Sequence, residues 1–309
     1  MIPRAPKVTR VYQNHHLDST RWDAFTPRDD DIVVATPYKS GTTWMQLIVQ
    51  ALLRGGQPTA SLNEVSPWLD MRMSPIDEVI GKLEALSHRR SIKTHLPLDG
   101  LRFFPQIKYV VVGRDARDVF MSLWNHYSNY MPDFYEKIND NPGRVGVPLP
   151  ICPDDIRQFW SGWISAGWFD WETEGYPFWS NMRHVQSWWD YRDIPNILFV
   201  HYNDLLADLE GEVLRVACFL DIEVPEEVLP RVVDSVTFGT VKQNAENIWP
   251  GMETSFRGGA QTFFHKGTNG RWKTVLTESD LKLYEAAVAR ELSAECAEWL
   301  EHAAAGEAE

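Results

Sequence analysis

The sequence has 309 residues, of which 44% are hydrophobic, so the chain is long enough to bury a large core. Its net charge is −13, which argues against nonspecific binding to nucleic acid or to an anionic membrane. The cysteines Cys152, Cys218 and Cys296 are scattered and form no CxxC pair, which argues against a disulfide framework and a zinc site. Because neither a signal peptide nor a run of about 18 apolar residues occurs, we expect a cytoplasmic protein with no membrane partner.

The first predicted elements are a strand, a short loop and a helix. Residues 31–36 (DIVVAT) form an apolar, partly β-branched run, which indicates a buried strand. From Thr43 the apolar residues change to helical spacing, and the pair Gly55-Gly56 predicts the end of that helix.

Three further strands are predicted, at residues 91–94, 107–113 and 196–201, with helices after the last two. Strands that alternate with helices predict an α/β fold with a parallel β-sheet flanked by helices. In such sheets ligands bind beyond the carboxyl ends of the strands. The positive and aromatic side chains expected there are Lys39, Lys93, Arg114 and Tyr202.

The segments between these elements differ in composition. Residues 128–150 are rich in Pro, Gly and Asn and are expected to form a long surface excursion, while residues 156–192 are dense in aromatics. The loop 243–263 has glycines and few apolar anchors, which suggests a mobile lid. Because no linker divides the chain, we expect a single domain over residues 1–309.

The loop TPYKSGTTW (residues 36–44) has the composition of an anion-binding site. Gly41 lets the backbone approach an anion, the N–H groups of the helix start point at it, and Lys39 adds a positive charge. The nucleotide-triphosphate motif G-x-x-x-x-G-K-[ST] is absent, because the one lysine precedes Gly41. Taken alone, the loop is equally compatible with a plain strand–helix turn.

Four other segments follow this loop in order: KTHLP (93–97), VVVGRDARDVFMSLWNHY (110–127), HYNDL (201–205) and KGTNGRWK (266–273). Together they resemble, in order and spacing, the cytosolic sulfotransferases that use 3′-phosphoadenosine 5′-phosphosulfate (PAPS). Weaker similarity extends from about residue 22 to residue 272. The resemblance implies a P-loop-kinase-like fold, in agreement with the periodicity of the sequence.

The resemblance also implies which residues bind PAPS. An arginine suits the 3′-phosphate because its planar fork donates two hydrogen bonds at once. Considered singly, most of these residues would be explained by packing or by surface exposure. The implied set is Lys39, Ser40, Gly41, Thr42 and Thr43 for the phosphosulfate, Trp44, Tyr202 and Phe238 for the adenine, and Arg114, Ser122, His265, Lys266 and Gly267 for the 3′-phosphate.

His95 is the candidate catalytic base. Sulfuryl transfer to an acceptor hydroxyl requires removal of the hydroxyl proton, and an imidazole is suited to that task near neutral pH. Lys39 and Lys93 would neutralise the charge that develops on the departing phosphate. No metal is required. His184 also matches a histidine of the family, but we expect it to be structural.

Three departures from the family pattern stand out. The usual order Tyr-Pro-Lys is Pro37-Tyr38-Lys39 here, which reshapes the entry to the loop because proline lacks an N–H. His265 stands where the family has an arginine, so weaker cofactor binding is expected unless Arg271 or Arg257 compensates. The dimerisation motif of the family, which would fall at residues 273–282, is not intact, so the chain is expected to be a monomer or a homodimer formed by another route.

The acceptor is expected to be a small hydroxyl compound with an apolar body. Trp68, Phe25 and part of the aromatic block 156–189 would line its pocket, with His95 facing the hydroxyl. Carbohydrate and lipid acceptors stay open. Two alternatives to a sulfotransferase are a nucleotide kinase-like phosphotransferase and a non-catalytic adenine-nucleotide-binding protein, the second motivated by His265.

Overall fold

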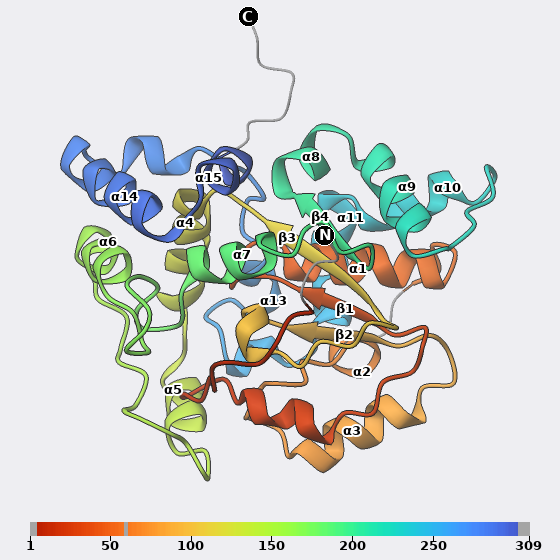
Figure 1. The fold of residues 1–309 in the computed structure, drawn as a ribbon, viewed down its shortest axis with the longest axis horizontal. Helices are drawn as coiled ribbons and strands as arrows, with labels where there is room; N and C mark the ends of the chain where they lie inside the picture. The colour runs from red at the N-terminus through yellow and green to blue at the C-terminus, as the bar shows by residue number, and fades with distance from the viewer. Residues whose placement is uncertain (1–4, 59–60, 302–309) are drawn as a thin grey trace, which may run out of the picture.

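Four parallel strands form one central sheet in the computed structural model, which describes residues 5–58 and 61–301. The strand order is β2-β1-β3-β4, and Ile32 of β1 pairs with Ser91 of β2 and Lys108 of β3 (Figure 1). The predicted strands and the parallel α/β fold are confirmed. The strands are β1 (Ile32–Ala35), β2 (Ser91–Thr94), β3 (Lys108–Gly113) and β4 (Ile197–His201).

One face of the sheet is covered by helices that pack on alternate strand residues. Ile32, Val34, Val110 and Val112 are fully buried in this cluster. Figure 1 shows α9 and α10 on this side of the sheet. The helices that contribute to it are α1 (Thr42–Leu53), α2 (Leu62–Val65), α8 (Tyr202–Ala207), α9 (Leu209–Phe219), α10 (Leu229–Val236), α11 (Phe238–Gln243) and α12 (Ala245–Ile248).

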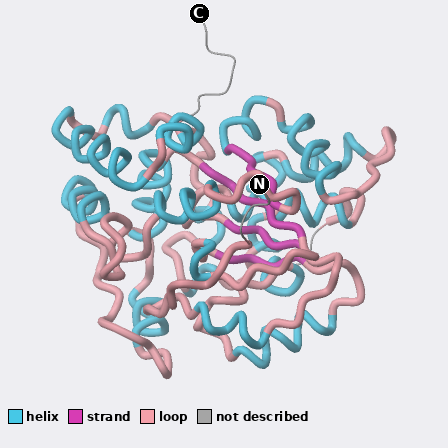
Figure 2. Tube along the Cα trace, in the orientation of Figure 1, coloured by secondary structure: helices cyan, strands magenta, loops and turns pink. Residues whose placement is uncertain are grey.

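The opposite face is built by the intervening residues Val33, Ala35, Tyr109 and Val111, as period-two alternation requires. Its helices surround the strands in the tube view (Figure 2), with α6 and α14 on the side away from α9 and α10 (Figure 1). They are η1 (Ser19–Ala24), α3 (Ile76–Ala85), η2 (Leu98–Gly100), α4 (Ala116–Tyr127), α5 (Pro132–Asn139), α6 (Ile156–Ser165), α7 (Asn181–Trp189), η3 (Met252–Thr254), α13 (Gly259–Phe263), η4 (Arg271–Thr274), α14 (Glu278–Glu291) and α15 (Ala294–Leu300).

Two segments are more ordered than the sequence indicated. The stretch 128–150 is not wholly irregular, because α5 forms within it and buries Phe134 and Ile138. The stretch 243–263 holds α12, η3 and α13, and its anchors Ile248, Phe256 and Ala260 are buried. The expectation that this second stretch has few apolar anchors is therefore wrong.

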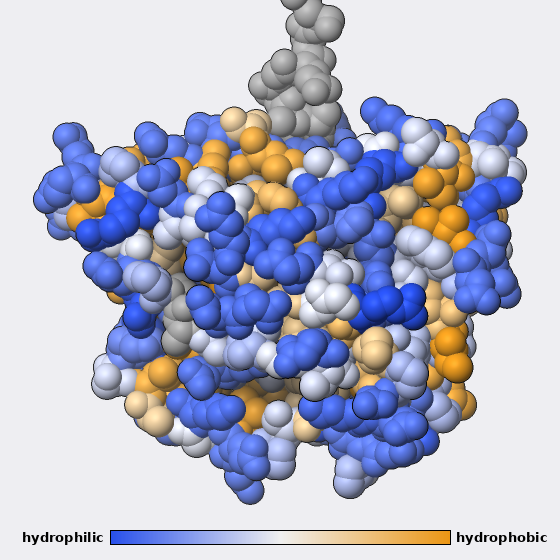
Figure 3. Space-filling model, turned by 180° about the vertical axis from the view of Figure 1, so that it is seen from behind, coloured by the Kyte–Doolittle hydropathy of each residue, from blue (hydrophilic) through white to orange (hydrophobic). Residues whose placement is uncertain are grey.

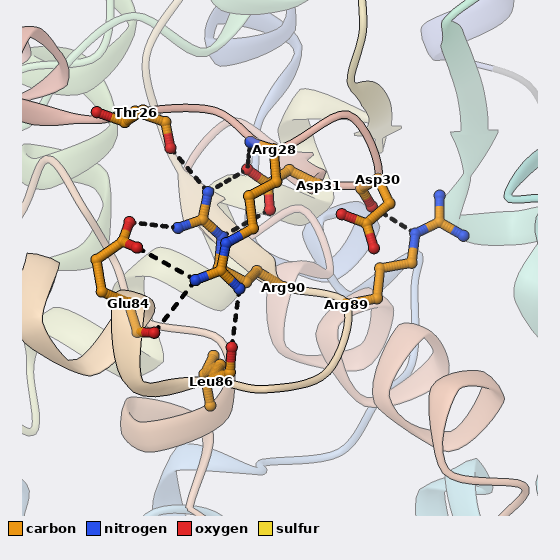
Figure 4. A network of polar contacts seen from close by, with 8 residues as sticks. All are labelled: Thr26, Arg28, Asp30, Asp31, Glu84, Leu86, Arg89 and Arg90. Carbon is orange, nitrogen blue, oxygen red and sulfur yellow. Dashed lines mark hydrogen bonds and ion pairs between the residues drawn. The ribbon is translucent and has the colours of Figure 1, made fainter.

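The amino ends of β1 and β2 are joined by an ion pair in the core (Figure 4). Arg90, just before β2, donates from Nε and Nη2 to Asp31, just before β1, at 2.7 and 2.5 Å. Both side chains are fully buried. Arg90 also donates to the Thr26 carbonyl and to Glu84, so its guanidinium ties both strands to α3.

The surface of the molecule is mainly hydrophilic when it is seen from behind, with apolar side chains in separate patches (Figure 3). Within the described part of the chain, no helix combines the length and the apolar character that a membrane crossing needs.

Candidate active site

A cavity of about 490 Å³ lies where the strands of the sheet end. Lys39 follows β1, Lys93 and His95 lie at the end of β2, Arg114 follows β3 and Tyr202 follows β4, and all five line this cavity. The sequence-predicted residues that line it are Lys39, Gly41, Thr42, Thr43, Trp44, Trp68, Lys93, His95, Arg114, Ser122, Tyr202, Phe238, His265, Lys266 and Gly267.

The loop between β1 and α1 has a backbone shape that few residues accept. Gly41 has φ 109° and Lys39 has φ 68°, so both lie in the left-handed region, which is strained for a lysine. A Cβ on Gly41 would lie 2.9 Å from Cδ2 of Tyr202. Glycine is therefore required here, and it lets the start of α1 face the cavity at Thr42 and Thr43 with the positive end of the helix dipole.

His95 is held with one ring nitrogen bonded and the other unused. Its Nδ1 donates to the Thr36 carbonyl at 2.8 Å, so the proton of the neutral ring is on Nδ1. Its Nε2 is buried and has no hydrogen-bond partner among the described residues. Burial, followed by the charge of Lys93, holds the pKa of His95 well below its usual range. The ring is therefore neutral and has a free lone pair at the cavity.

A half-buried lysine, Lys39, and a buried one, Lys93, line the cavity together with His95. Burial, then the charges of Lys93 and Arg114, lowers the pKa of Lys39 to about 7. Burial also lowers the pKa of Lys93 to about 8, and its Nζ lies 4.2 Å from the centre of the Trp68 ring. Because opposite charge restores the charged form, these shifts favour binding of an anion between the two side chains.

Arg114 lies at the other end of the cavity, flat against an aromatic ring. Its guanidinium carbon is 4.1 Å from the centre of the Tyr202 ring, and its Nε and Nη2 donate to the Asn269 side-chain oxygen at 3.0 and 2.5 Å. Ser122, on α4, also lines the cavity. Asn269 thus orients the arginine fork that the sequence singled out.

Arg271 is a second arginine in this region. It lines the cavity, and its Nε is buried without a hydrogen-bond partner among the described residues. Burial and the charge of Arg114 lower its pKa. His265 also lines the cavity, but burial and the nearby cations lower its pKa, so it adds no positive charge. Arg257, the other candidate to compensate for His265, is exposed and is not among the cavity residues.

Aromatic rings form the walls near these arginines. Trp44 lies 5.4 Å from Tyr202, edge to face, and its Nε1 donates to the Val236 carbonyl at 2.8 Å. Phe238 is 37% exposed, so its face is open to the cavity. A Cβ on Gly267 would lie 2.8 Å from Cδ2 of Phe238, which explains the glycine after Lys266. Trp44, Tyr202 and Phe238 thus all line the cavity.

Apolar side chains form much of the remaining lining of the cavity, together with polar ones such as Asn63, Lys82 and Lys137. Trp68 lies 4.7 Å from His95, ring to ring, and forms one wall. The other apolar walls come from loops and helices that the motifs do not include. They are Met71, Met73, Val79, Phe134, Trp249, Met252, Phe256 and Phe263.

Comparison with known proteins assigns the family of this site. The sequence model of the sulfotransferase domain matches residues 29–295, most of the chain. The chain belongs to the sulfotransferase family. A glycolipid sulfotransferase of Mycobacterium tuberculosis is 33% identical over 284 residues, 87% of this sulfotransferase and 87% of that protein. Human sulfotransferase 1E1 is 28% identical over 267 residues, 83% of this chain and 82% of its own.

Solved structures share the fold of this sulfotransferase. Mouse sulfotransferase SULT7A1, complexed with PAP, matches with a TM-score of 0.69 at 19% identity over 91% of this chain and 92% of its own. Retinol dehydratase, in complex with androsterone and PAP, matches with a TM-score of 0.67 at 22% identity over 89% of this chain and 84% of its own.

Three sequence-based expectations are not met at the cavity of this sulfotransferase. Phe25 packs on Trp22, Phe104 and Arg90, at the amino ends of the strands, which is the wrong end of the sheet for the site. The tryptophans of residues 156–189 do not line the cavity either, because they are buried in or against the core. Ser40 is fully buried beneath the loop, and its hydroxyl has no partner among the described residues.

The residues that the sequence missed share one property, which is that no local pattern marks them. Trp249, Phe256 and Phe263 lie in the segment that was expected to form a lid, His16 stands outside the motifs, and His126 lies in a motif but was given no role there. Only contact across the fold brings them to the site. In the part of the chain that the structure describes, no three His, Cys, Asp or Glu side chains are grouped so as to hold a metal ion.

Proposed function

We propose that this sulfotransferase transfers the sulfuryl group of PAPS to a hydroxyl of a small acceptor with an apolar body, with His95 as the base. The observation that carries the proposal is the position of His95. Its Nε2 has no hydrogen-bond partner among the described residues, its ring packs on Trp68, and it lines the same cavity as Lys39 and Lys93.

The residues of the cavity fit the donor nucleotide. Lys39, Thr42 and Thr43 would hold the phosphosulfate end at the start of α1. The rings of Trp44, Tyr202 and Phe238 would contact the adenine, with Arg114 and Ser122 on the 3′-phosphate. The lowered pKa values of the two lysines and the unpartnered Nε of Arg271 support an anionic ligand.

His95 would remove the acceptor proton at Nε2. The Nδ1–H bond to the Thr36 carbonyl fixes the ring orientation and would stabilise the imidazolium that forms. Bound PAPS would supply the sulfuryl group and leave as 3′-phosphoadenosine 5′-phosphate (PAP). Lys39 and Lys93 would meanwhile offset the negative charge that grows on the 5′-phosphate.

The apolar lining of the cavity supports an acceptor with a hydrophobic body. Its methionine, phenylalanine and tryptophan side chains would contact that body, and the acceptor would expose its hydroxyl to His95. The mycobacterial relatives are named glycolipid sulfotransferases, and a lipid-bearing hydroxyl compound is within this class.

Nucleotide selectivity tests the donor. PAP should raise the melting temperature of the chain strongly, because a ligand that binds only the folded state stabilises it by mass action. ATP with magnesium should have little effect, since the motif that holds its metal is absent. Thermal denaturation with each nucleotide measures this. Stabilisation by ATP with magnesium alone would contradict the proposal.

Arg271→Gln should weaken PAP binding by about 10- to 100-fold. A hydrogen bond to a charged group contributes about 1.5–3 kcal/mol, and Arg271 has the buried, unused donor that His265 cannot supply. Titration calorimetry with PAP measures the loss. Arg257→Gln is the matched control, because Arg257 is exposed outside the cavity and should bind PAP as the unmodified chain does. Equal affinities of the two variants would exclude a phosphate role for Arg271.

A further inference from the structure

The exchanged order Pro37-Tyr38 brings a phenol next to the lysine of the loop. The Tyr38 hydroxyl lies 2.8 Å from Nε2 of His126 and 3.2 Å from the hydroxyl of Tyr130. The other ring nitrogen of His126, Nδ1, lies 3.4 Å from Nζ of Lys39. Four polar side chains thus form a continuous chain of hydrogen bonds that starts at the loop lysine.

The direction of this chain is fixed by its first member. Below the Lys39 pKa of about 7, its ammonium has no lone pair and can only donate, so Nδ1 of His126 accepts. A neutral imidazole that accepts at Nδ1 carries its proton at Nε2, where it donates to the Tyr38 oxygen. Tyr38 therefore accepts a hydrogen bond from the tautomer of His126 that can receive a bond from Lys39.

Lys39 has few other groups to fix its position. Its Nζ lies 4.4 Å from the centre of the Phe263 ring. Within residues 5–58 and 61–301, no carboxylate forms an ion pair with it. A lysine side chain loses considerable rotamer entropy when it is held in one place. A neutral acceptor that holds Lys39 before the nucleotide binds therefore favours the geometry of the bound state.

We propose that His126 is a positioning residue of this sulfotransferase, which holds the Lys39 ammonium at the phosphosulfate end of the cavity, and that Tyr38 fixes His126 for this role. The inference rests on the proposed function of Lys39, but the hydrogen-bond chain is testable without nucleotide. It also gives the exchanged order a purpose, since proline at position 38 would have no hydroxyl to offer.

The surrounding positive charges disfavour the protonated form of Lys39. The bond to His126 therefore affects the protonation of Lys39 as well as its position. Burial and the cations Lys93 and Arg114 lower its pKa to about 7. The imidazole is itself neutral, because burial, then Lys39, holds its pKa well below the usual range. The groups that face these two side chains are Lys93 and His95 from the β2 end, Arg114 after β3, His16 from the amino-terminal segment, and Tyr38 and Tyr130.

The sign of the pH dependence follows from this arrangement. PAP binding needs Lys39 protonated, so affinity should fall as the pH rises through the Lys39 pKa of the free protein, about 7. An acceptor bonded to the ammonium favours its charged form. Loss of that acceptor lowers the Lys39 pKa, so the fall in affinity should begin at a lower pH.

Three substitutions at position 126 separate the two bonds of the ring. Asparagine places an amide oxygen as many bonds from Cα as Nδ1 and keeps the acceptor for Lys39. Glutamine places an amide nitrogen as many bonds from Cα as Nε2 and keeps only the contact with Tyr38. Phenylalanine keeps neither. Tyr127→Phe is the matched control, because it removes a buried hydroxyl of the same helix that bonds to the Pro150 carbonyl instead.

Calorimetric titration with PAP over a series of pH values tests the proposal. We expect His126→Phe and His126→Gln to lose affinity at about one pH unit lower than the unmodified chain, which is about tenfold weaker binding above neutral pH. His126→Asn and Tyr127→Phe should follow the unmodified profile. A His126→Phe profile with an unchanged midpoint would overturn the role of His126.

The tautomer of His126 gives a second measurement that needs neither nucleotide nor activity. At a pH below the Lys39 pKa of about 7, long-range proton–nitrogen NMR of the unmodified protein should show the proton on Nε2, and Tyr38→Phe should shift the ring toward a mixture of tautomers. A proton on Nδ1 in the unmodified chain would overturn the proposal. Failure of the unmodified chain to bind PAP at all, with the Nε2–H tautomer present, would instead contradict the proposed donor.

Discussion

Replacement of His95 by alanine should lower the rate of sulfuryl transfer by about 10²- to 10⁴-fold, the contribution typical of a positioned general base. The lone pair of its Nε2 is free at the cavity, because Nδ1 carries the proton and donates it to the Thr36 carbonyl in a hydrogen bond. PAP affinity should change little, since the proposed phosphate contacts come from other elements. Transfer of labelled sulfate from PAPS to an acceptor measures the rate, and calorimetry with PAP measures the binding.

His184 provides the control for this variant. Like His95 it is a fully buried histidine with a lowered pKa, but it does not line the cavity. His184→Leu should therefore transfer sulfate as the unmodified chain does. Full activity in His95→Ala on an identified acceptor would show that another group removes the hydroxyl proton.

The site residues that could be predicted from the sequence are those placed by the ends of the strands. Lys39, Lys93, Arg114 and Tyr202 all lie at the carboxyl ends of apolar runs, and parallel pairing brings those ends to one edge. Local pattern and sheet geometry therefore suffice to predict that these side chains meet. The β1–α1 loop could be predicted as well, because its glycine and the start of its helix are adjacent in the sequence.

The apolar lining of the cavity could not be predicted from the local sequence pattern. Phe134 comes from a helix in a segment that read as irregular, and Trp249 and Phe256 come from a segment that read as a lid. Their burial depends on which long connections fold back over the sheet, which residue spacing does not specify. The prediction for Phe25 was wrong for the same reason, because the sequence near a strand does not indicate at which end of the sheet an aromatic side chain packs.

The exchanged residues Pro37 and Tyr38 illustrate the limit most clearly. The sequence showed that they depart from the family order, but the partners that explain Tyr38 lie 88 and 92 residues later in the chain. A hydrogen bond between side chains so far apart leaves no trace in spacing or composition. The motif therefore showed that Pro37 and Tyr38 depart from the family order, and only the tertiary structure showed which side chains Tyr38 contacts.

Arg90→Met should destabilise the fold by about 3–5 kcal/mol, the cost of removing one partner of a buried ion pair. The methionine fills much of the same volume but leaves the Asp31 carboxylate buried without its cation (Figure 4). Urea denaturation, followed by circular dichroism, measures the free energy of unfolding. Arg28→Met is the control in the same network, because Arg28 and its partner Glu84 are partly exposed, and it should cost about 1 kcal/mol.

The double variant Arg90→Met/Asp31→Asn separates loss of the pair from loss of packing. If the cost of Arg90→Met comes from the unpaired carboxylate, removal of that charge should make the double variant more stable than Arg90→Met alone. Asparagine keeps a side-chain oxygen for the Arg28 backbone N–H that Asp31 now receives at 2.7 Å. Additive losses in the double variant would instead mean that Arg90 stabilises the strand ends through its bonds to Thr26 and Glu84, independently of the Asp31 charge.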